Sequence, residues 1–227
     1  MVGIHLRSQN IDTIEKLIDE MQINCFQLFL EPRNGLSLKN KLHYRAVFQR
    51  LKKVESVVSI YIHSQDNVAL TTSRSNSSIN SWKLIRQKLK EADDLSVDGL
   101  IVHVNVSNNA DIEKITEEMN SVFFDFSYRC KLLLENTALK NVIGSEMDLF
   151  NKLIKRLNEN QTVNVCLDTA HLFESGYLFK NKEEANEMKK KFPFIFSKTT
   201  LVHLNDSNTK SGSFIDRHAH LGKGYIG

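Results

Sequence analysis

The chain has 227 residues, of which 25% are charged and 41% are hydrophobic, and its formal net charge is +3. These proportions are typical of a globular protein. No apolar stretch reaches about 18 residues and the N-terminus does not resemble a signal peptide, so we expect a soluble intracellular protein without a membrane span. The small positive charge permits a phosphate-rich partner but does not indicate one, because nucleic-acid binders usually carry clustered charge.

Strand-like apolar runs begin near residues 2, 25, 57, 99, 130, 163 and 200. Their spacing of roughly thirty to forty residues is the size of a strand–helix–strand unit. Apolar residues at helical spacing lie between them, at residues 11–21, 82–92 and 147–157. Strands that alternate with amphipathic helices predict a parallel sheet covered by helices.

The three cysteines, Cys25, Cys130 and Cys166, fall within the predicted strands, far apart and without C-x-x-C spacing. An odd number of buried thiols predicts a reducing compartment rather than a disulfide framework. The composition does not separate cytoplasm from nucleus. No linker rich in Pro, Gly or charge divides the chain, so we expect a single domain over residues 1–227.

Residues 71–81 are rich in Ser, Thr and Asn and predict a loop after the third strand. Loops at that end of a barrel usually serve the substrate. An equally good interpretation is a solvated connector that ends in a helix N-cap at Ser78 or Ser81.

Five of the apolar runs end on a residue type that binds zinc. These residues are His63, His103, Glu135, Asp168 and His203. In a barrel of parallel strands all carboxyl ends meet on one face, whereas an open sheet binds ligands at a switch point served by about two strands. Five contributing strands therefore favour an α/β barrel of the TIM (β/α)8 type. Eight strands close such a barrel and seven runs can be counted, so we expect it to lack the eighth βα unit.

Three further candidate ligands follow two of these strand ends. His171 comes three residues after Asp168, and both face one cavity if the chain turns into a helix there. Asp216 and His218 lie on one side of an extended segment because their spacing is two. Each zinc takes three or four protein ligands and carboxylates bridge ions, so eight candidates suit two or three ions.

Each candidate also has a simpler interpretation. A lone strand-end His is often a hydrogen-bonded core residue, and a lone Asp after a strand is often a helix N-cap. Their joint placement favours a metal, because a folded core has no use for so many converging ionisable groups. His5, at the end of the first predicted strand, is a candidate for supporting the ligands. His43 and His220 are expected on the surface.

Several sequence blocks together resemble one known family. They are Gly-Ile-His at residues 3–5, Glu-Asn-Thr-Ala at 135–138, Cys-Leu-Asp-Thr-Ala-His at 166–171 with Gly-Tyr at 176–177, His-Leu-Asn-Asp-Ser at 203–207, Gly-Ser-Phe-Ile-Asp-Arg-His at 212–218 and Leu-Gly-Lys-Gly-Tyr-Ile-Gly at 221–227. The chain resembles endonuclease IV, the zinc-dependent apurinic/apyrimidinic endonucleases within the xylose-isomerase-like barrel superfamily. The blocks extend from the N-terminus to the last residue.

The resemblance implies three zinc ions. Carried over by motif, His63 and His103 hold the first ion, Glu135 bridges it to the second, Asp168 and His203 complete the second, and His171, Asp216 and His218 hold the third. The family's ninth ligand is a Glu at the end of strand eight, which the seven runs do not include. The second ion is therefore expected to be under-coordinated.

The resemblance also implies hydrolysis of the phosphodiester on the 5′ side of abasic sites in double-stranded DNA, by a monomer. Glu135 is the implied catalytic residue, because it positions a water that zinc makes acidic. The target nucleotide is expected to flip out of the duplex. The expected contacts to the DNA backbone come from four loop residues: Arg33, Asn34, Asn205 and Lys210. No Ser–His or Cys–His motif offers a side-chain nucleophile.

The likeness is weaker where the family contacts DNA. After His63 the chain has Ser-Gln-Asp instead of a segment with a probing aromatic, and after His103 it has Val-Asn instead of Pro-Gly. Two alternatives therefore stay open. One is a sugar isomerase or epimerase on the same barrel, which typically uses one or two metals; the Asp216 and His218 pair speaks against it. The other is a degenerate, non-catalytic DNA-binding homologue.

Overall fold

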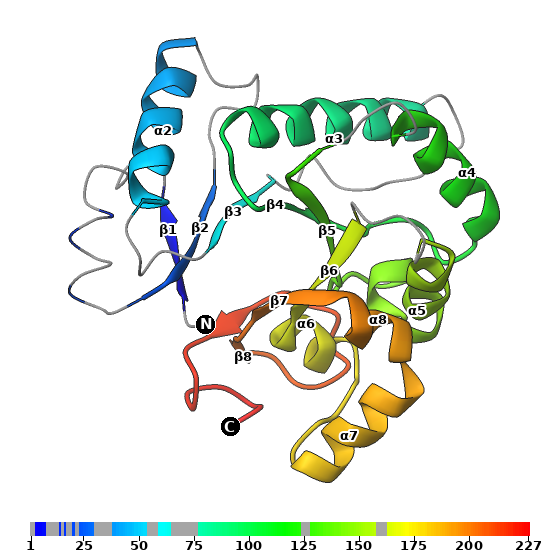
Figure 1. The fold of residues 1–227 in the computed structure, drawn as a ribbon. Coiled ribbons are helices and arrows are strands. Elements are labelled where there is room, and N and C mark those ends of the chain that lie inside the picture. The colour runs from blue at the N-terminus through cyan, green and yellow to red at the C-terminus, as the bar shows by residue number, and fades with distance from the viewer. Residues whose placement is uncertain are drawn as a thin grey trace.

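The computed structural model describes residues 3–7, 14, 16, 20, 23–29, 38–53, 59–64, 77–123, 128–157 and 163–227. Seven parallel strands form one sheet in sequence order (Figure 1). They are β1 (Gly3–Arg7), β2 (Cys25–Phe29), β3 (Ser59–His63), β4 (Gly99–His103), β5 (Lys131–Glu135), β6 (Val163–Asp168) and β7 (Thr199–His203). Two short strands, β8 (Asp206–Ser207) and β9 (His218–Ala219), pair antiparallel beyond β7. The predicted strand positions are confirmed.

Helices follow most of the strands. They are α2 (Leu38–Leu51), α3 (Ser77–Asp94), α4 (Ile112–Phe123), α5 (Met147–Arg156), α6 (Thr169–Glu174), α7 (Lys182–Lys191) and α8 (Pro193–Lys198), with a 3-10 turn, η2 (Ile143–Ser145), before α5. Among the described helices, none is both long and apolar enough to cross a bilayer.

The sheet is curled rather than flat. The Nε2 atom of His203, at the end of β7, lies 2.7 Å from Oε1 of Gln27 in β2, although β7 and β2 are far apart in the strand order. Only a sheet that bends round an interior brings these two side chains together. The architecture is that of a TIM-type barrel, and the expected α/β barrel with seven counted strands is confirmed for the described residues.

The interior of the barrel holds a small apolar layer. Its members are Cys25, Tyr61, Ile101, Leu133 and Cys166, with Leu201 packed against them. Five of these residues precede a strand-end ligand candidate by two positions, as Leu133 precedes Glu135. Because side chains alternate along a strand, the apolar layer and the polar residues above it point into the same interior.

The larger core lies between the sheet and the helices. Two of the predicted apolar stripes are confirmed as buried faces. On α3 the buried residues are Trp82, Ile85, Leu89 and Ala92, and along α5 they are Met147, Phe150, Leu153, Ile154 and Leu157, just past its end. Figure 1 shows α3, α4 and α5 along the outside of the strands. Of the stripe at residues 11–21, most lies outside the described residues, but Ile14 is fully buried.

Three local predictions need correction. Helix α3 begins at Ser77, so Ser78 and Ser81 lie within it and neither is its N-cap. Packing of the apolar stripe that follows outweighs the weak helix propensity of Ser and Asn; residues 71–76 lie outside the described part of the chain. Strand β1 continues to Arg7, so His5 lies in its middle. Cys130 precedes β5 by one residue, although all three cysteines are buried and unpaired as expected.

Replacing Phe150 with Ala should destabilise the protein by about 3–5 kcal/mol, because removing the fully buried ring leaves a cavity in the larger core. Urea denaturation followed by circular dichroism measures the change. The control is Leu42→Ala on α2, whose side chain is 59% exposed and whose removal should change stability by less than about 0.5 kcal/mol. Equal effects of the two changes would contradict the described packing.

Candidate metal centre

Glu135 lies at the centre of the strand-end residues. Its side chain is 1% exposed. Its Oε2 atom is 2.9 Å from Nε2 of His63 and 3.3 Å from Nε2 of His103. Its Oε1 atom is 2.7 Å from Nδ1 of His203. The two carboxylate oxygens therefore face two separate groups of imidazoles, which is the arrangement a bridging ligand needs.

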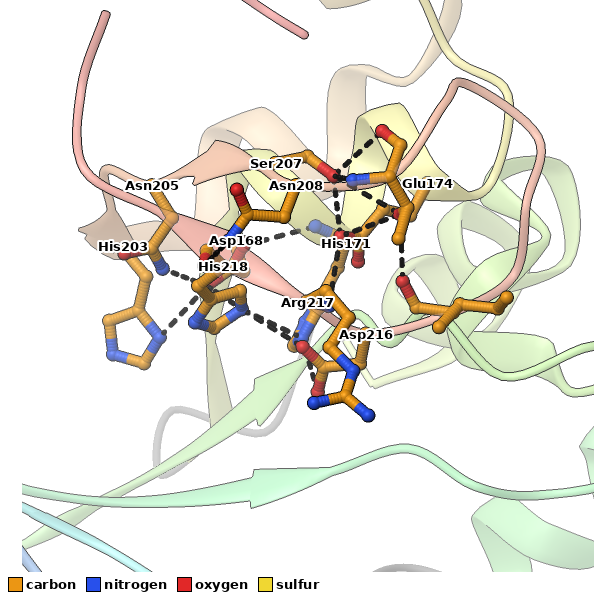
Figure 2. A network of polar contacts seen from close by, with 12 residues as sticks. Asp168, His171, Glu174, His203, Asn205, Ser207, Asn208, Asp216, Arg217 and His218 are labelled. Carbon is orange, nitrogen blue, oxygen red and sulfur yellow. Dashed lines mark hydrogen bonds and ion pairs between the residues drawn. The ribbon is translucent and has the colours of Figure 1, made fainter. Parts of the chain in front are cut away.

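A second cluster forms where α6 meets the loop before β9. Asp168 caps α6 by accepting a hydrogen bond from the backbone N–H of His171 at 3.0 Å. This cap turns the chain so that His171 faces the same hollow as Asp168. Nε2 of His171 lies 3.3 Å from Oδ2 of Asp216 and 3.4 Å from Nε2 of His218 (Figure 2). The structure thus brings together all eight predicted ligands.

The donor atoms form three groups, in each of which they lie within 4.8 Å of one another. The groups are His63, His103 and Glu135; Glu135, Cys166 and His203; and Asp168, His171 and His218. Asp168 lies between the second and third groups, because its Oδ2 is 3.6 Å from Nδ1 of His203 and 3.7 Å from Nε2 of His218. Imidazole nitrogen and carboxylate oxygen at this spacing suit zinc.

Three of the five imidazoles are also oriented as metal ligands usually are. Nδ1 of His63 lies 2.6 Å from the carbonyl oxygen of Ser64, and Nδ1 of His171 lies 2.8 Å from that of Asn136. In His203 the order is reversed, because Nε2 contacts Gln27. Metal-binding histidines typically donate one ring N–H to a protein acceptor, which fixes the ring and leaves the other nitrogen for the metal.

Two of the imidazoles, those of His171 and His203, are coupled electrostatically to carboxylates. Burial opposes ionisation of Glu135, but contacts with the neighbouring histidines, His203 first, hold its pKa well below the usual range. Burial likewise disfavours the charged form of His171, yet Asp168 and Asp216 outweigh it and raise the pKa of His171 to about 10. Hydrogen bonding from His171 lowers the pKa of Asp216. The carboxylates are therefore ionised near neutral pH, as metal binding requires.

Two neighbours of the candidate ligands, Gln27 and Cys166, were not predicted. Gln27 contacts His203, and its Nε2 atom is 3.3 Å from Nδ1 of His5, so His5 supports the ligands through Gln27. The Cys166 thiol joins Glu135 and His203. Its position two residues before Asp168 was the signal available in the sequence, because such residues share a face. No comparable signal exists for Gln27, because its partner comes from across the barrel.

Asn136 joins the ends of two neighbouring strands. Its Oδ1 accepts from the backbone N–H of Asp168 at 2.7 Å, and its Nδ2 donates to the carbonyl oxygen of Asp168 at 3.0 Å. The side chain is buried. This pair of hydrogen bonds fixes Asp168 relative to Glu135, which immediately precedes Asn136.

The predicted DNA contacts are less well supported than the ligands. Arg33 and Asn34 lie outside the described residues. The amide of Asn205 donates to Oδ2 of Asp168 at 2.6 Å, so it is engaged in holding a ligand. Lys210 is exposed on the loop between β8 and β9. His43 and His220 are exposed, as expected.

Exposure differs strongly across the site. Glu135 is almost fully buried, whereas the side chains of His218 and Asp216 are 42% and 50% exposed. Asp216 and His218 are therefore the most solvent-accessible of the eight candidate ligands.

The sequence comparisons agree with this arrangement. Residues 9–227 match the family model described as Xylose isomerase-like TIM barrel. A probable endonuclease 4 of Finegoldia magna is 30% identical over an alignment of 237 residues that covers all of this chain and 82% of that relative. The chain belongs to the endonuclease IV family of xylose isomerase-like barrels. The resemblance found in the sequence motifs is confirmed.

Two further relatives support this family membership. The crystal structure of endonuclease IV from Thermus thermophilus matches with a TM-score of 0.75 and 25% identity, over 99% of this chain and 83% of that one. Apurinic-apyrimidinic endonuclease 1 of Plasmodium falciparum is 37% identical over 129 residues, which are 55% of this chain and 20% of that relative.

The stability of the protein in the presence of a chelator should fall as the pH rises from about 6.5 to 10. The folded pKa of His171 is about 10 against an ordinary 6.5. Its stabilising protonation is therefore complete below pH 6.5 and is lost as the pH rises through 10. Thermal unfolding between pH 6 and 10 measures the effect. In the variant His171→Gln the melting temperature should depend less on pH. Parallel pH dependences of the two proteins would contradict the pairing of His171 with Asp168 and Asp216.

Proposed function

We propose that this protein is a zinc-dependent endonuclease that hydrolyses the phosphodiester on the 5′ side of abasic sites in DNA. The observation that carries the proposal is the set of three adjoining donor groups, linked by Glu135 and Asp168 and opening to solvent at Asp216 and His218. The names of the family relatives support a DNA substrate, and that of the Plasmodium falciparum relative supports an abasic one.

Each of the three donor groups would hold one ion. His63 and His103 with Glu135 would hold the first ion; Glu135, Asp168 and His203 would hold the second; and His171, Asp216 and His218 would hold the third. Among the described residues, the Cys166 thiol also lies within this second group, beside Glu135 and His203. Zinc bound there supplies Lewis-acid chemistry, lowering the pKa of water and neutralising phosphate charge.

The protein's own residues supply position and charge. Glu135 presents one oxygen to each of two donor groups, so it fixes their separation and is the proposed catalytic residue. Asn205 holds Asp168 through its amide, which keeps that carboxylate between the second and third groups. The buried layer of Tyr61, Ile101 and Leu133 closes the floor of the site to water. Reaction therefore takes place at the open end of the barrel.

Contacts to the DNA backbone complete the proposal. Lys210 lies exposed on the same loop as Asp216, so its ammonium group is available to phosphates beside the ligands. Arg33, Asn34 and Asn205 remain proposed contacts from the family resemblance. We expect an extrahelical nucleotide, because Glu135, at the centre of the donor groups, is buried.

A sugar isomerase or epimerase on the same barrel is the alternative. The third donor group argues against it, because such enzymes typically need one or two metals, whereas His171, Asp216 and His218 add a further site. We therefore expect no turnover of ketoses.

Cleavage of a duplex that carries a single abasic site tests the proposal. We expect a single cut on the 5′ side of the lesion, which leaves a 3′-hydroxyl on the upstream fragment and the phosphate with the abasic sugar on the downstream one. A chelator should abolish it, and zinc should restore it. Products are resolved on a sequencing gel against an undamaged duplex. Binding of zinc and DNA without cleavage would replace the proposal with a non-catalytic DNA-binding homologue, and turnover of a ketose alone would replace it with the isomerase.

Replacing Glu135 with Gln should lower the rate of abasic-site cleavage by about 1000-fold or more, because losing the bridging charge removes several kcal/mol of transition-state stabilisation. Single-turnover kinetics measure the rate. The matched control is Glu146→Gln, a carboxylate outside the site that accepts a hydrogen bond from Asn108; its rate should be unchanged. Wild-type turnover by the Glu135 variant would rule out the bridging role.

A further inference from the structure

Helix α6 presents three polar residues at intervals of three. Asp168 is its N-cap, His171 lies in its first turn and Glu174 is its last residue. Residues three apart are neighbours on a helix surface, so these side chains follow one side of the helix. The first two face the metal centre. Glu174 has no role in the proposed mechanism, and yet it is 0% exposed.

The carboxylate of Glu174 is bound to the loop that carries two of the ligands. Its Oε1 atom accepts from Oγ of Ser207 at 2.6 Å, from the backbone N–H of Arg217 at 3.1 Å and from Oγ1 of Thr209 at 3.3 Å. The carbonyl oxygen of Glu174 accepts from the backbone N–H of Phe214 at 2.9 Å. The dashed lines of Figure 2 converge on Glu174 from this loop.

Stability alone does not account for this residue. Its second oxygen, Oε2, is buried and has no hydrogen-bond partner among the described residues. Burying an ionisable group with an unpaired oxygen is unfavourable, and an apolar residue of similar volume is often as stable or more stable at such a position. The hydrogen bonds that the Glu174 carboxylate accepts from the loop are the simpler explanation for a glutamate at this position.

The loop needs such an anchor more than the other ligand-bearing segments do. His63, His103 and Glu135 end strands of the sheet, which hold their backbone in place. Asp216 lies outside any strand, and His218 begins the two-residue strand β9, whose pairing with β8 is equally short. Both side chains are exposed, and the backbone N–H of Arg217, between them, is the group that Glu174 binds. Anchoring Arg217 sets where its two neighbours point.

We propose that Glu174 is a positioning residue for the third metal group: it acts as a hydrogen-bond acceptor that holds Asp216 and His218 against His171. The inference rests on the proposed function, because it assumes that this group binds zinc. Glu174 and His171 belong to the same short helix, α6. That helix would therefore position His171 directly, and Asp216 and His218 through Glu174.

The test measures zinc binding by Glu174→Leu and Glu174→Gln. Leu fills a similar volume and cannot accept hydrogen bonds, so one ion should bind about 10- to 100-fold more weakly while the others are unchanged. Gln keeps an oxygen that accepts the same three hydrogen bonds, and its amide replaces the unpaired Oε2, so its affinities should match those of the wild type. Metal content is measured by mass spectrometry and affinity by competition with a chelator.

Two variants calibrate the result. His218→Ala removes a proposed ligand and should lose the same ion as Glu174→Leu. Asn151→Ala is the matched structural control, because its Oδ1 accepts from the backbone N–H groups of Phe194 and Ile195, away from the site. It should lower stability and leave all zinc affinities unchanged. If Glu174→Leu does not fold, Ser207→Ala removes the shortest hydrogen bond to the carboxylate and should weaken the same ion.

The outcomes separate this inference from the proposed function. Selective loss of one ion in the Leu variant, with recovery in the Gln variant, supports it. Unchanged zinc binding by Glu174→Leu in a protein that cleaves abasic DNA overturns the inference alone, as does loss of all ions together. A Gln variant that behaves like Leu overturns the acceptor role. A wild-type protein that binds no zinc overturns both.

Discussion

Contact between Glu135 and imidazoles from three different strands is the interaction on which the rest of the site depends. Its oxygens meet His63 and His103 on one side and His203 on the other. Because β7 and β3 are separated by three strands, these contacts exist only if the sheet bends round its interior. The apolar layer that fills this interior therefore stabilises the fold and sets the spacing of the ligands at once.

The centre combines two kinds of support. Ligands on strand ends are held by the parallel sheet and by Asn136, which joins β5 to β6. The candidate ligands Asp216 and His218 are exposed; β8 pairs with His218, and Glu174 is the proposed side-chain anchor between them. The site therefore joins a buried half at the strand ends to an exposed half on the C-terminal segment.

The strand-end positions were predictable because two local signals coincide there. A continuous apolar run marks a buried strand, and a single polar residue at its end marks the barrel mouth, as with His103 after residues 100–102. Where only composition was available, the prediction was wrong: Ser78 and Ser81 suggested an N-cap, but the helix had already begun. The DNA contact predicted for Asn205 stays a prediction, and the structure adds that its amide donates to Asp168.

The sequence by itself determined which strands exist and where five of them end, because continuous apolar runs mark buried strands. It also determined which side chains share a face, because side chains alternate with a period of two along a strand. Tertiary structure decided which faces meet. The pairing of Gln27 with His203, of Cys166 with that same imidazole and of Glu174 with the backbone of Arg217 depends on the curl of the sheet and the path of a loop. Neither leaves a periodic pattern in the chain, because both depend on contacts between residues far apart in sequence.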